Sequence, residues 1–126
     1  MSVFREVRRL PEFEKDLKKL SKRFRTLEDD LSNFITSQLK LYHKLQTDNG
    51  GIFKIQGLPQ RKDTEIFKAR KFASRSLMGK GVQSGIRVIY AYHAEADEID
   101  LVEIYYKGDR ENEDRDRVIR YLEERE

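Results

Sequence analysis

The chain has 126 residues, of which 37% are hydrophobic and 39% are charged, and its formal net charge is +3 at pH 7. This length supports one domain, 1–126, with a single small core under a heavily charged surface. The absence of cysteine excludes disulfides and cysteine-based zinc sites and favours a reducing, cytoplasmic location. No apolar run approaches the ~18 residues of a membrane-spanning helix, and residues 1–17 lack the apolar core of a signal peptide, so we expect no membrane partner.

The N-terminal half predicts a strand followed by two helices. Residues 2–10 alternate imperfectly and indicate a short strand. Pro11 then stands where a helix can begin, and an apolar stripe follows at helical spacing: Phe13, Leu17, Leu20 and Phe24. Residues 26–45 indicate a second helix, and because the link between the two is short, we expect an antiparallel helical hairpin. We expect residues 51–64 to be an irregular connection.

The C-terminal half predicts strands followed by a helix. The stretches IFKARKF (66–72) and SGIRVIYAY (84–92) indicate neighbouring strands joined by the long loop 73–85. EIDLVEIYYKG (98–108) indicates a further strand, and residues 112–126 a terminal helix. The order β-α-α-β-β-β-α predicts an α+β fold, with a small, mainly antiparallel sheet covered on one face by the N-terminal helical hairpin. We expect the other face of the sheet to stay open.

Cations stand inside the predicted strands, where a plain strand would carry apolar residues. Lys68 and Arg70 share one face of the first of these strands, and Arg87 lies on the next strand. Residues 54–87 hold nine cations against two carboxylates, a net charge of about +7. This clustering favours a polyanionic partner, with nucleic acid first. The alternative is a solubilising surface whose cations pair with Glu65, Glu103 or Asp100.

Five cations form a candidate catalytic site on the open face: Lys68, Arg70, Arg87, Lys107 and Arg110. Long cationic side chains bind a phosphodiester and stabilise the extra negative charge of its pentavalent transition state. A crowded lysine can also lose its proton near neutral pH and act as a base, and RNA supplies its own nucleophile, the 2′-OH. The further candidates for RNA binding are Lys71, Arg75, Lys80, Tyr105 and Tyr106.

Other chemistry has little support in the sequence. The GKG stretch at 79–81 lacks both the spacing and the strand-to-helix context of a Walker phosphate loop. His43 and His93 have no acidic partner at ligand spacing, so we predict structural histidines, no metal and no cofactor. No serine can be tied to a base.

Several motifs resemble the RelE/ParE toxin superfamily of bacterial and archaeal type II toxin–antitoxin systems, and most of all its RelE and HigB members. The matching stretches are GLP (57–59), IFKARKF, GIRVIYAY and LVEIYYKGDREN (101–112), which runs into the terminal helix. The order of strands and helices also matches over nearly the whole chain. The resemblance implies a small cytoplasmic endoribonuclease, an mRNA interferase that cleaves mRNA in the ribosomal A site without a metal. Such toxins inhibit translation, arrest growth and are silenced by a cognate antitoxin.

The resemblance also implies roles for the cations. Lys68 and Arg70 match a pair of basic residues on the family's second strand, and Arg87 matches the arginine that supports the scissile phosphate. Lys107 and Arg110 match basic residues after the last strand. In the implied mechanism, Lys68 or Arg70 helps to deprotonate the 2′-OH, and Arg87 stabilises the phosphorane. Lys107 or Arg110 then assists the leaving 5′-oxygen, and a 2′,3′-cyclic phosphate remains.

The chain departs from the family's pattern at three points. The histidine that other branches carry after the last strand is absent, and the loop from Ala73 to Ser84 is longer than in compact members. The third departure concerns base stacking. Some RelE-type enzymes carry a tyrosine in or near the last helix that stacks on a base; Asp114 stands near that position, and Tyr105 or Tyr106 is the candidate replacement. The superfamily also holds ParE-like toxins, which inhibit DNA gyrase through protein contacts, and non-catalytic relatives. The basic cluster favours the nuclease, because gyrase inhibition does not require convergent phosphate ligands.

Overall fold

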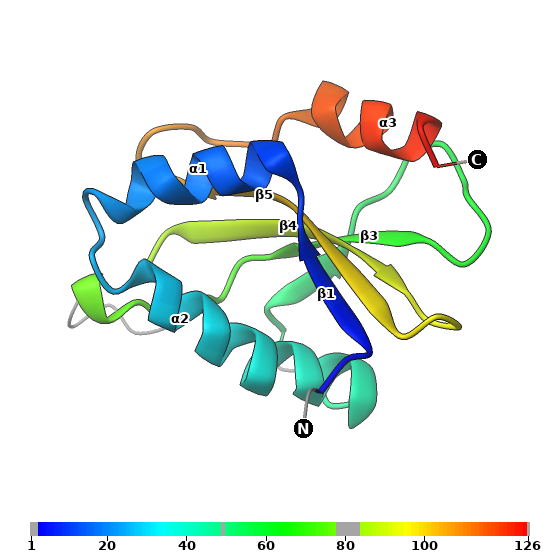
Figure 1. The fold of residues 1–126 in the computed structure, drawn as a ribbon, viewed down its shortest axis with the longest axis horizontal. Helices are drawn as coiled ribbons and strands as arrows, with labels where there is room; N and C mark the ends of the chain where they lie inside the picture. The colour runs from blue at the N-terminus through cyan, green and yellow to red at the C-terminus, as the bar shows by residue number, and fades with distance from the viewer. Residues whose placement is uncertain (1–2, 49, 78–83, 126) are drawn as a thin grey trace.

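In the computed structural model, residues 3–48, 50–77 and 84–125 are described. Within these ranges, strands form a five-stranded sheet in the order β1-β5-β4-β3-β2 (Figure 1). The strands are β1 (Glu6–Arg9), β2 (Ile52–Lys54), β3 (Glu65–Ala69), β4 (Ile86–His93) and β5 (Glu98–Tyr106). Neighbours run antiparallel except β1 and β5, which are parallel. The predicted mainly antiparallel sheet is therefore confirmed.

The helices follow the predicted order. They are α1 (Pro11–Ser21), α2 (Leu27–Phe34), the π-helix η1 (Ile35–Lys44), the short 3₁₀ helix η2 (Arg75–Leu77) and α3 (Arg115–Glu123). The predicted second helix therefore exists, but its second half is wound as a π-helix that continues α2. Asp114 caps α3, because its side chain accepts a hydrogen bond from the Arg117 amide at 3.2 Å. No helix within the described ranges is long and apolar enough to cross a bilayer.

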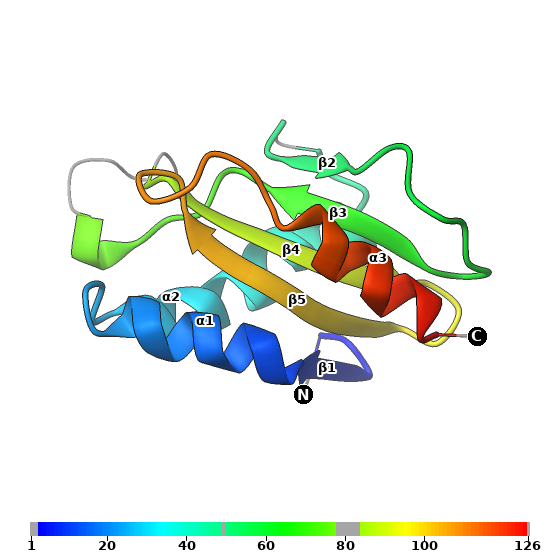
Figure 2. The same ribbon diagram turned by 90° about the horizontal axis from the view of Figure 1, so that it is seen from above.

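Helices lie on both faces of the sheet (Figure 2). The α1–α2 hairpin packs on one face over the main core, which includes Phe13, Leu17, Leu31, Phe67, Val88 and Tyr90. On the opposite face, α3 packs through Val118 and Leu122 against a second cluster with Ile66, Ile89 and Val102. The predicted α+β class and its helical hairpin are confirmed. The expectation of an open second face is wrong for the part under α3, because Val118 and Leu122 form an apolar stripe that only this face can bury.

One edge strand, β2, was not predicted. Its three residues are too few for an alternating pattern, and Phe53 and Lys54 are exposed. Only Ile52, which pairs with Ala69, is buried in the main core. Beyond the β2–β3 pairing, the Arg70 amide donates to the Gly51 carbonyl at 2.8 Å, so the two segments stay together past the end of β3.

A buried polar network ties α3 to the sheet. Asp100 on β5 is 1% exposed and accepts hydrogen bonds from Arg8 Nε at 2.6 Å and from the Tyr121 hydroxyl at 2.5 Å. His93 Nε2 and Arg125 Nη1 lie 3.1 and 3.3 Å from Asp100 Oδ2. Burial alone would raise the pKa of Asp100, but the hydrogen bonds of His93, Tyr121 and Arg8 outweigh burial and hold this pKa well below its ordinary value. The network therefore fixes α3, and with it the loop that precedes α3.

Candidate functional site

Predicted cations gather around Tyr105 at one end of the sheet, on the face that also carries α3. Arg87 lies near the start of β4 and stands directly opposite Tyr105 in the β4–β5 register. Lys68 Nζ lies 5.9 Å from the centre of the Tyr105 ring, and the Arg110 guanidinium carbon lies 4.6 Å from it. Arg70 follows β3 and contacts Arg87 through its carbonyl. We call Lys68, Arg70, Arg87 and Arg110 the cationic cluster.

Arg87 is the most buried member of the cationic cluster. The residue is 9% exposed, and its Nη1 donates to the Arg70 carbonyl at 2.9 Å. Burial, and then the charge of Arg70, lower the pKa of Arg87, but a guanidinium stays charged at neutral pH. Among the described residues, no carboxylate forms an ion pair with Arg87 or with the exposed Arg70. These two groups therefore keep the positive charge that phosphate binding needs.

Lys68 forms an ion pair with Glu113, on the loop before α3. Lys68 Nζ lies 2.8 Å from Glu113 Oε1, and each side chain is 17% exposed. Burial opposes both charges. The hydrogen bond to Glu113, aided by the nearby Tyr105 hydroxyl, outweighs burial and raises the pKa of Lys68, while the hydrogen bond from Lys68 lowers the pKa of Glu113. At neutral pH, Lys68 is therefore an ammonium and Glu113 a carboxylate, which opposes the predicted role of Lys68 as a base.

A second carboxylate, Glu103, lies fully buried beneath the cationic cluster. It accepts a hydrogen bond from Arg110 Nη2 and another from the Asp114 amide, the latter at 2.9 Å. The pairing that the sequence left as an alternative therefore exists for Arg110 with Glu103, whereas Lys68 pairs with Glu113, which was not among the predicted partners. Lys107 is exposed at the end of β5, where its amide donates to the Gly85 carbonyl at 2.8 Å.

Neither tyrosine predicted for RNA binding offers an open ring face. Tyr105 is 3% exposed and lies under Arg110, and its hydroxyl makes no well-formed hydrogen bond with a described residue. Tyr106 points to the opposite face of the sheet, where its ring centre lies 5.0 Å from that of Phe24 and 5.3 Å from the Arg23 guanidinium carbon. Alternation along β5 separates the two rings onto different faces.

Of the three lysine and arginine residues predicted for RNA binding, only Lys71 and Arg75 lie within the described residues. Arg75 is tied to α2, with Nη2 3.2 Å from Asp29 and Nε 3.4 Å from Asp30. Lys71 is half-buried beyond the end of β3. Lys80 lies outside the described residues. The structure thus brings Lys68, Arg70, Arg87 and Arg110 together, and gives Arg75 a structural partner elsewhere.

Two residues of this face were missed by the sequence analysis, Phe53 and Glu113, and Glu103 was predicted only as an alternative partner for a cation. The alternation of β5 places Glu103 on the face of Tyr105, so a signal for it existed. Glu113 lies in an acidic run, and only the folding back of the loop brings it to Lys68. Phe53 lies directly opposite Lys68 in the β2–β3 register, which requires knowledge of β2.

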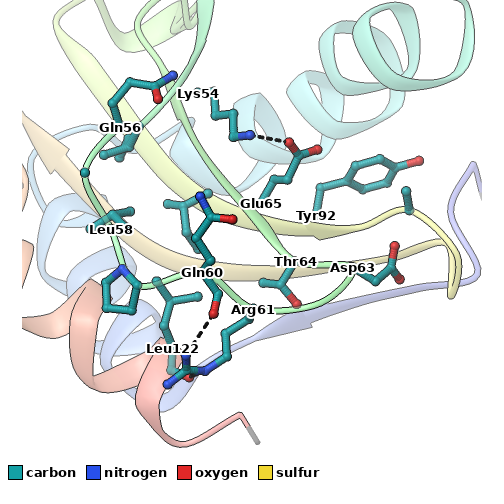
Figure 3. A pocket seen from close by; sticks show the side chains of 15 residues that line it. Lys54, Gln56, Leu58, Gln60, Arg61, Asp63, Thr64, Glu65, Tyr92 and Leu122 are labelled. Carbon is teal, nitrogen blue, oxygen red and sulfur yellow. Dashed lines mark hydrogen bonds and ion pairs between the residues drawn. The ribbon is translucent and has the colours of Figure 1, made fainter.

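A cavity of about 290 Å³ lies apart from the cationic cluster, between residues 54–61 and the start of β3 (Figure 3). Arg61 Nε donates to the Leu122 carbonyl at 2.8 Å, and Lys54 Nζ lies 2.7 Å from Glu65. These polar groups bind one another, and no predicted site residue lines the cavity. Over the described part of the chain, no group of three or more His, Asp or Glu side chains could hold a metal.

Neither a protein-family model nor a curated protein matches this sequence. Among solved structures, the chain is similar to the archaeal RelE–RelB complex from Pyrococcus horikoshii OT3, with 15% sequence identity and a TM-score of 0.49. The match covers 85% of this chain and 98% of that chain.

Proposed function

We propose that this protein is the toxin of a type II toxin–antitoxin system, an endoribonuclease that cleaves mRNA on translating ribosomes by attack of a 2′-OH. The observation that carries the proposal is the cationic cluster. Arg70 and Arg87 lie together at an accessible end of the sheet and have no carboxylate partner among the described residues. Such a pair suits a phosphodiester and its transition state, and the motifs shared with RelE-type toxins point to the same chemistry.

The two arginines have different tasks in this proposal. Arg87 is held by the Arg70 carbonyl and by burial, so its guanidinium is fixed before the substrate arrives, as stabilisation of a phosphorane requires. Arg70 is exposed and binds the phosphate backbone of the incoming strand.

The proton acceptor is a carboxylate rather than a cation. Arginine does not release its proton in proteins, and the ion pair with Glu113 keeps Lys68 protonated. Both oxygens of Glu103 already accept hydrogen bonds beneath the surface, so Glu113 is the accessible base. A substrate phosphate that binds Lys68 would compete with Glu113 and make its carboxylate more basic.

Cleavage in this proposal needs one base and one acid. The Glu113 carboxylate takes the proton of the 2′-OH, the 2′-oxygen bonds to phosphorus, and the bond from phosphorus to the 5′-oxygen breaks. The leaving oxygen takes a proton from the Lys107 ammonium, because an arginine such as Arg110 cannot supply one. The products are a 2′,3′-cyclic phosphate and a 5′-hydroxyl.

The proposed partners follow from the same surface. The ribosome presents mRNA in its A site, and a cognate antitoxin covers the cationic cluster in the cytoplasm. An acidic or amphipathic antitoxin segment would complement the charges of Arg70 and Arg87.

The proposal is tested by inducible expression followed by mapping of mRNA 5′ ends on translating ribosomes. Wild-type protein should arrest growth and cut mRNA, and Arg87→Ala should do neither. Arg25→Ala, which removes an exposed arginine between α1 and α2, is the matched control and should behave as wild type. Growth arrest without cleavage would remove the nuclease proposal; a DNA-damage response would then favour gyrase inhibition, and a harmless wild type would favour a non-catalytic relative.

A further inference from the structure

An exposed aromatic ring near the phosphate ligands of a nuclease increases its affinity for single-stranded RNA, because unpaired bases stack on such rings. Tyr105 cannot stack on a base, because it is buried under Arg110. Tyr106 packs against Phe24 on the opposite face of the sheet. The sequence-based candidates for a stacking residue are therefore excluded by their positions.

Phe53 meets the geometric requirement. It lies on the edge strand β2, directly opposite Lys68, so its side chain projects from the face of the cationic cluster. Its neighbour Ile52 is buried in the main core, whereas Phe53 is 46% exposed. The other exposed large apolar residues of the described chain, Leu41 and Leu45, belong to η1 and its end.

The ring of Phe53 also has a cation beside it. The Arg70 guanidinium carbon lies 5.8 Å from the ring centre, near the ~6 Å outer limit of a cation–π contact. The ring face is therefore not closely covered by its neighbour. An aromatic ring next to an unneutralised arginine is the pairing that single-strand binding surfaces use: the ring takes a base, and the cation takes the adjoining phosphate.

We propose that Phe53 and Arg70 form a nucleobase subsite, in which an unpaired base of the RNA stacks on Phe53 while Arg70 binds the phosphate next to it. The subsite rests on the proposed function for its substrate, but it assigns a residue and an edge of the sheet that the proposed cleavage does not need. It places the base beyond Lys68, on the β2 side of the scissile phosphate.

The test uses the full chain and a short single-stranded RNA made of 2′-O-methyl nucleotides, which cannot be cleaved through the 2′-oxygen. Its affinity is measured by fluorescence anisotropy at low salt. Phe53→Leu keeps an apolar side chain without an aromatic face and should weaken binding about 5- to 150-fold, the range of one base–aromatic stack. Phe53→Tyr should restore the affinity. Leu45→Ala removes an exposed leucine from the end of η1 and should leave it unchanged.

A set of oligonucleotides, each with one abasic position, identifies the stacked base. For wild-type protein, one abasic position should weaken binding, and in Phe53→Leu the same position should no longer matter. Three results would each overturn the subsite. They are equal affinities of Phe53→Leu and wild type, an equal loss of affinity at every abasic position, and no binding of RNA by the wild type. If Phe53→Leu instead loses affinity only for a partner protein, the exposed ring is a protein anchor, and the subsite is likewise overturned. Cleavage of mRNA on ribosomes, measured separately on wild type, decides whether the proposed function fails with it.

Discussion

Replacement of Asp100 by asparagine should destabilise the protein strongly, although Asp100 lies outside the cationic cluster. The carboxylate is 1% exposed and receives hydrogen bonds from Arg8 and Tyr121. Removing one partner of a buried charge pair costs ~3–5 kcal/mol, and because Arg8 is one-third exposed and keeps Glu98, we expect about 3 kcal/mol. At ~4 °C per kcal/mol for a chain of this length, Tm falls by about 12 °C.

Thermal unfolding followed by circular dichroism measures this change, with Asp109→Asn as the control. Asp109 pairs with Arg23 at the surface, where both side chains are about half exposed, so its loss should cost at most ~1 kcal/mol.

Because folding lowers the pKa of Asp100, its stabilisation is complete above the unfolded value of ~3.9 and is lost as pH falls below that value. The difference in Tm between wild type and Asp100→Asn should therefore shrink below pH 4. If the Tm of Asp100→Asn lay within 3 °C of wild type at pH 7, the buried carboxylate of Asp100 would not contribute the expected stability.

Three other predictions concern single residues. Gly85→Ala should lower the urea midpoint by an amount equivalent to ~1–3 kcal/mol, because φ is +89° and a Cβ would lie 3.1 Å from the Tyr106 ring; an unchanged midpoint would contradict this. Burial lowers the pKa of His43 to about 4, so its NMR titration should have its midpoint there rather than near 6.5. Since the unfolded state protonates first, the contribution of His43 to stability should decline as pH falls below ~6.5. Glu113→Gln should slow mRNA cleavage by ~10²-fold or more and remove the acidic limb of its pH–rate profile while RNA binding persists, and cleavage at the wild-type rate would exclude Glu113 as the base.

The sequence predicted the elements whose signal is local. Apolar spacing from Phe13 to Leu20 indicates α1, and the runs of β-branched, apolar and aromatic residues in 86–93 and 98–106 indicate the long strands β4 and β5. It also placed Lys68 and Arg70 on one face of the same strand, because side chains two positions apart on a strand point the same way. These predictions needed no knowledge of which segments meet in space.

Features that depend on distant contacts could not be predicted in this way. β2 has only three residues, and its identity depends on pairing with β3. The pairing of Lys68 with Glu113 joins residues 45 positions apart and depends on how the loop before α3 folds back. In the sequence, Phe53 belongs to a predicted irregular connection. Its position beside Arg70 depends on the edge strand β2, which the sequence did not predict.

The proposed function requires that the cationic cluster support attack by a 2′-OH on the RNA phosphodiester. The most direct test compares two mRNAs on programmed ribosomes, one all-ribo and one with a single 2′-deoxynucleotide on the 5′ side of the mapped cut, both without added divalent ion beyond what the ribosomes need. We expect cleavage of the first with a 2′,3′-cyclic phosphate end, and no cleavage of the second at that position. Equal cleavage of both mRNAs, or of neither, would contradict attack by the 2′-OH at the cationic cluster.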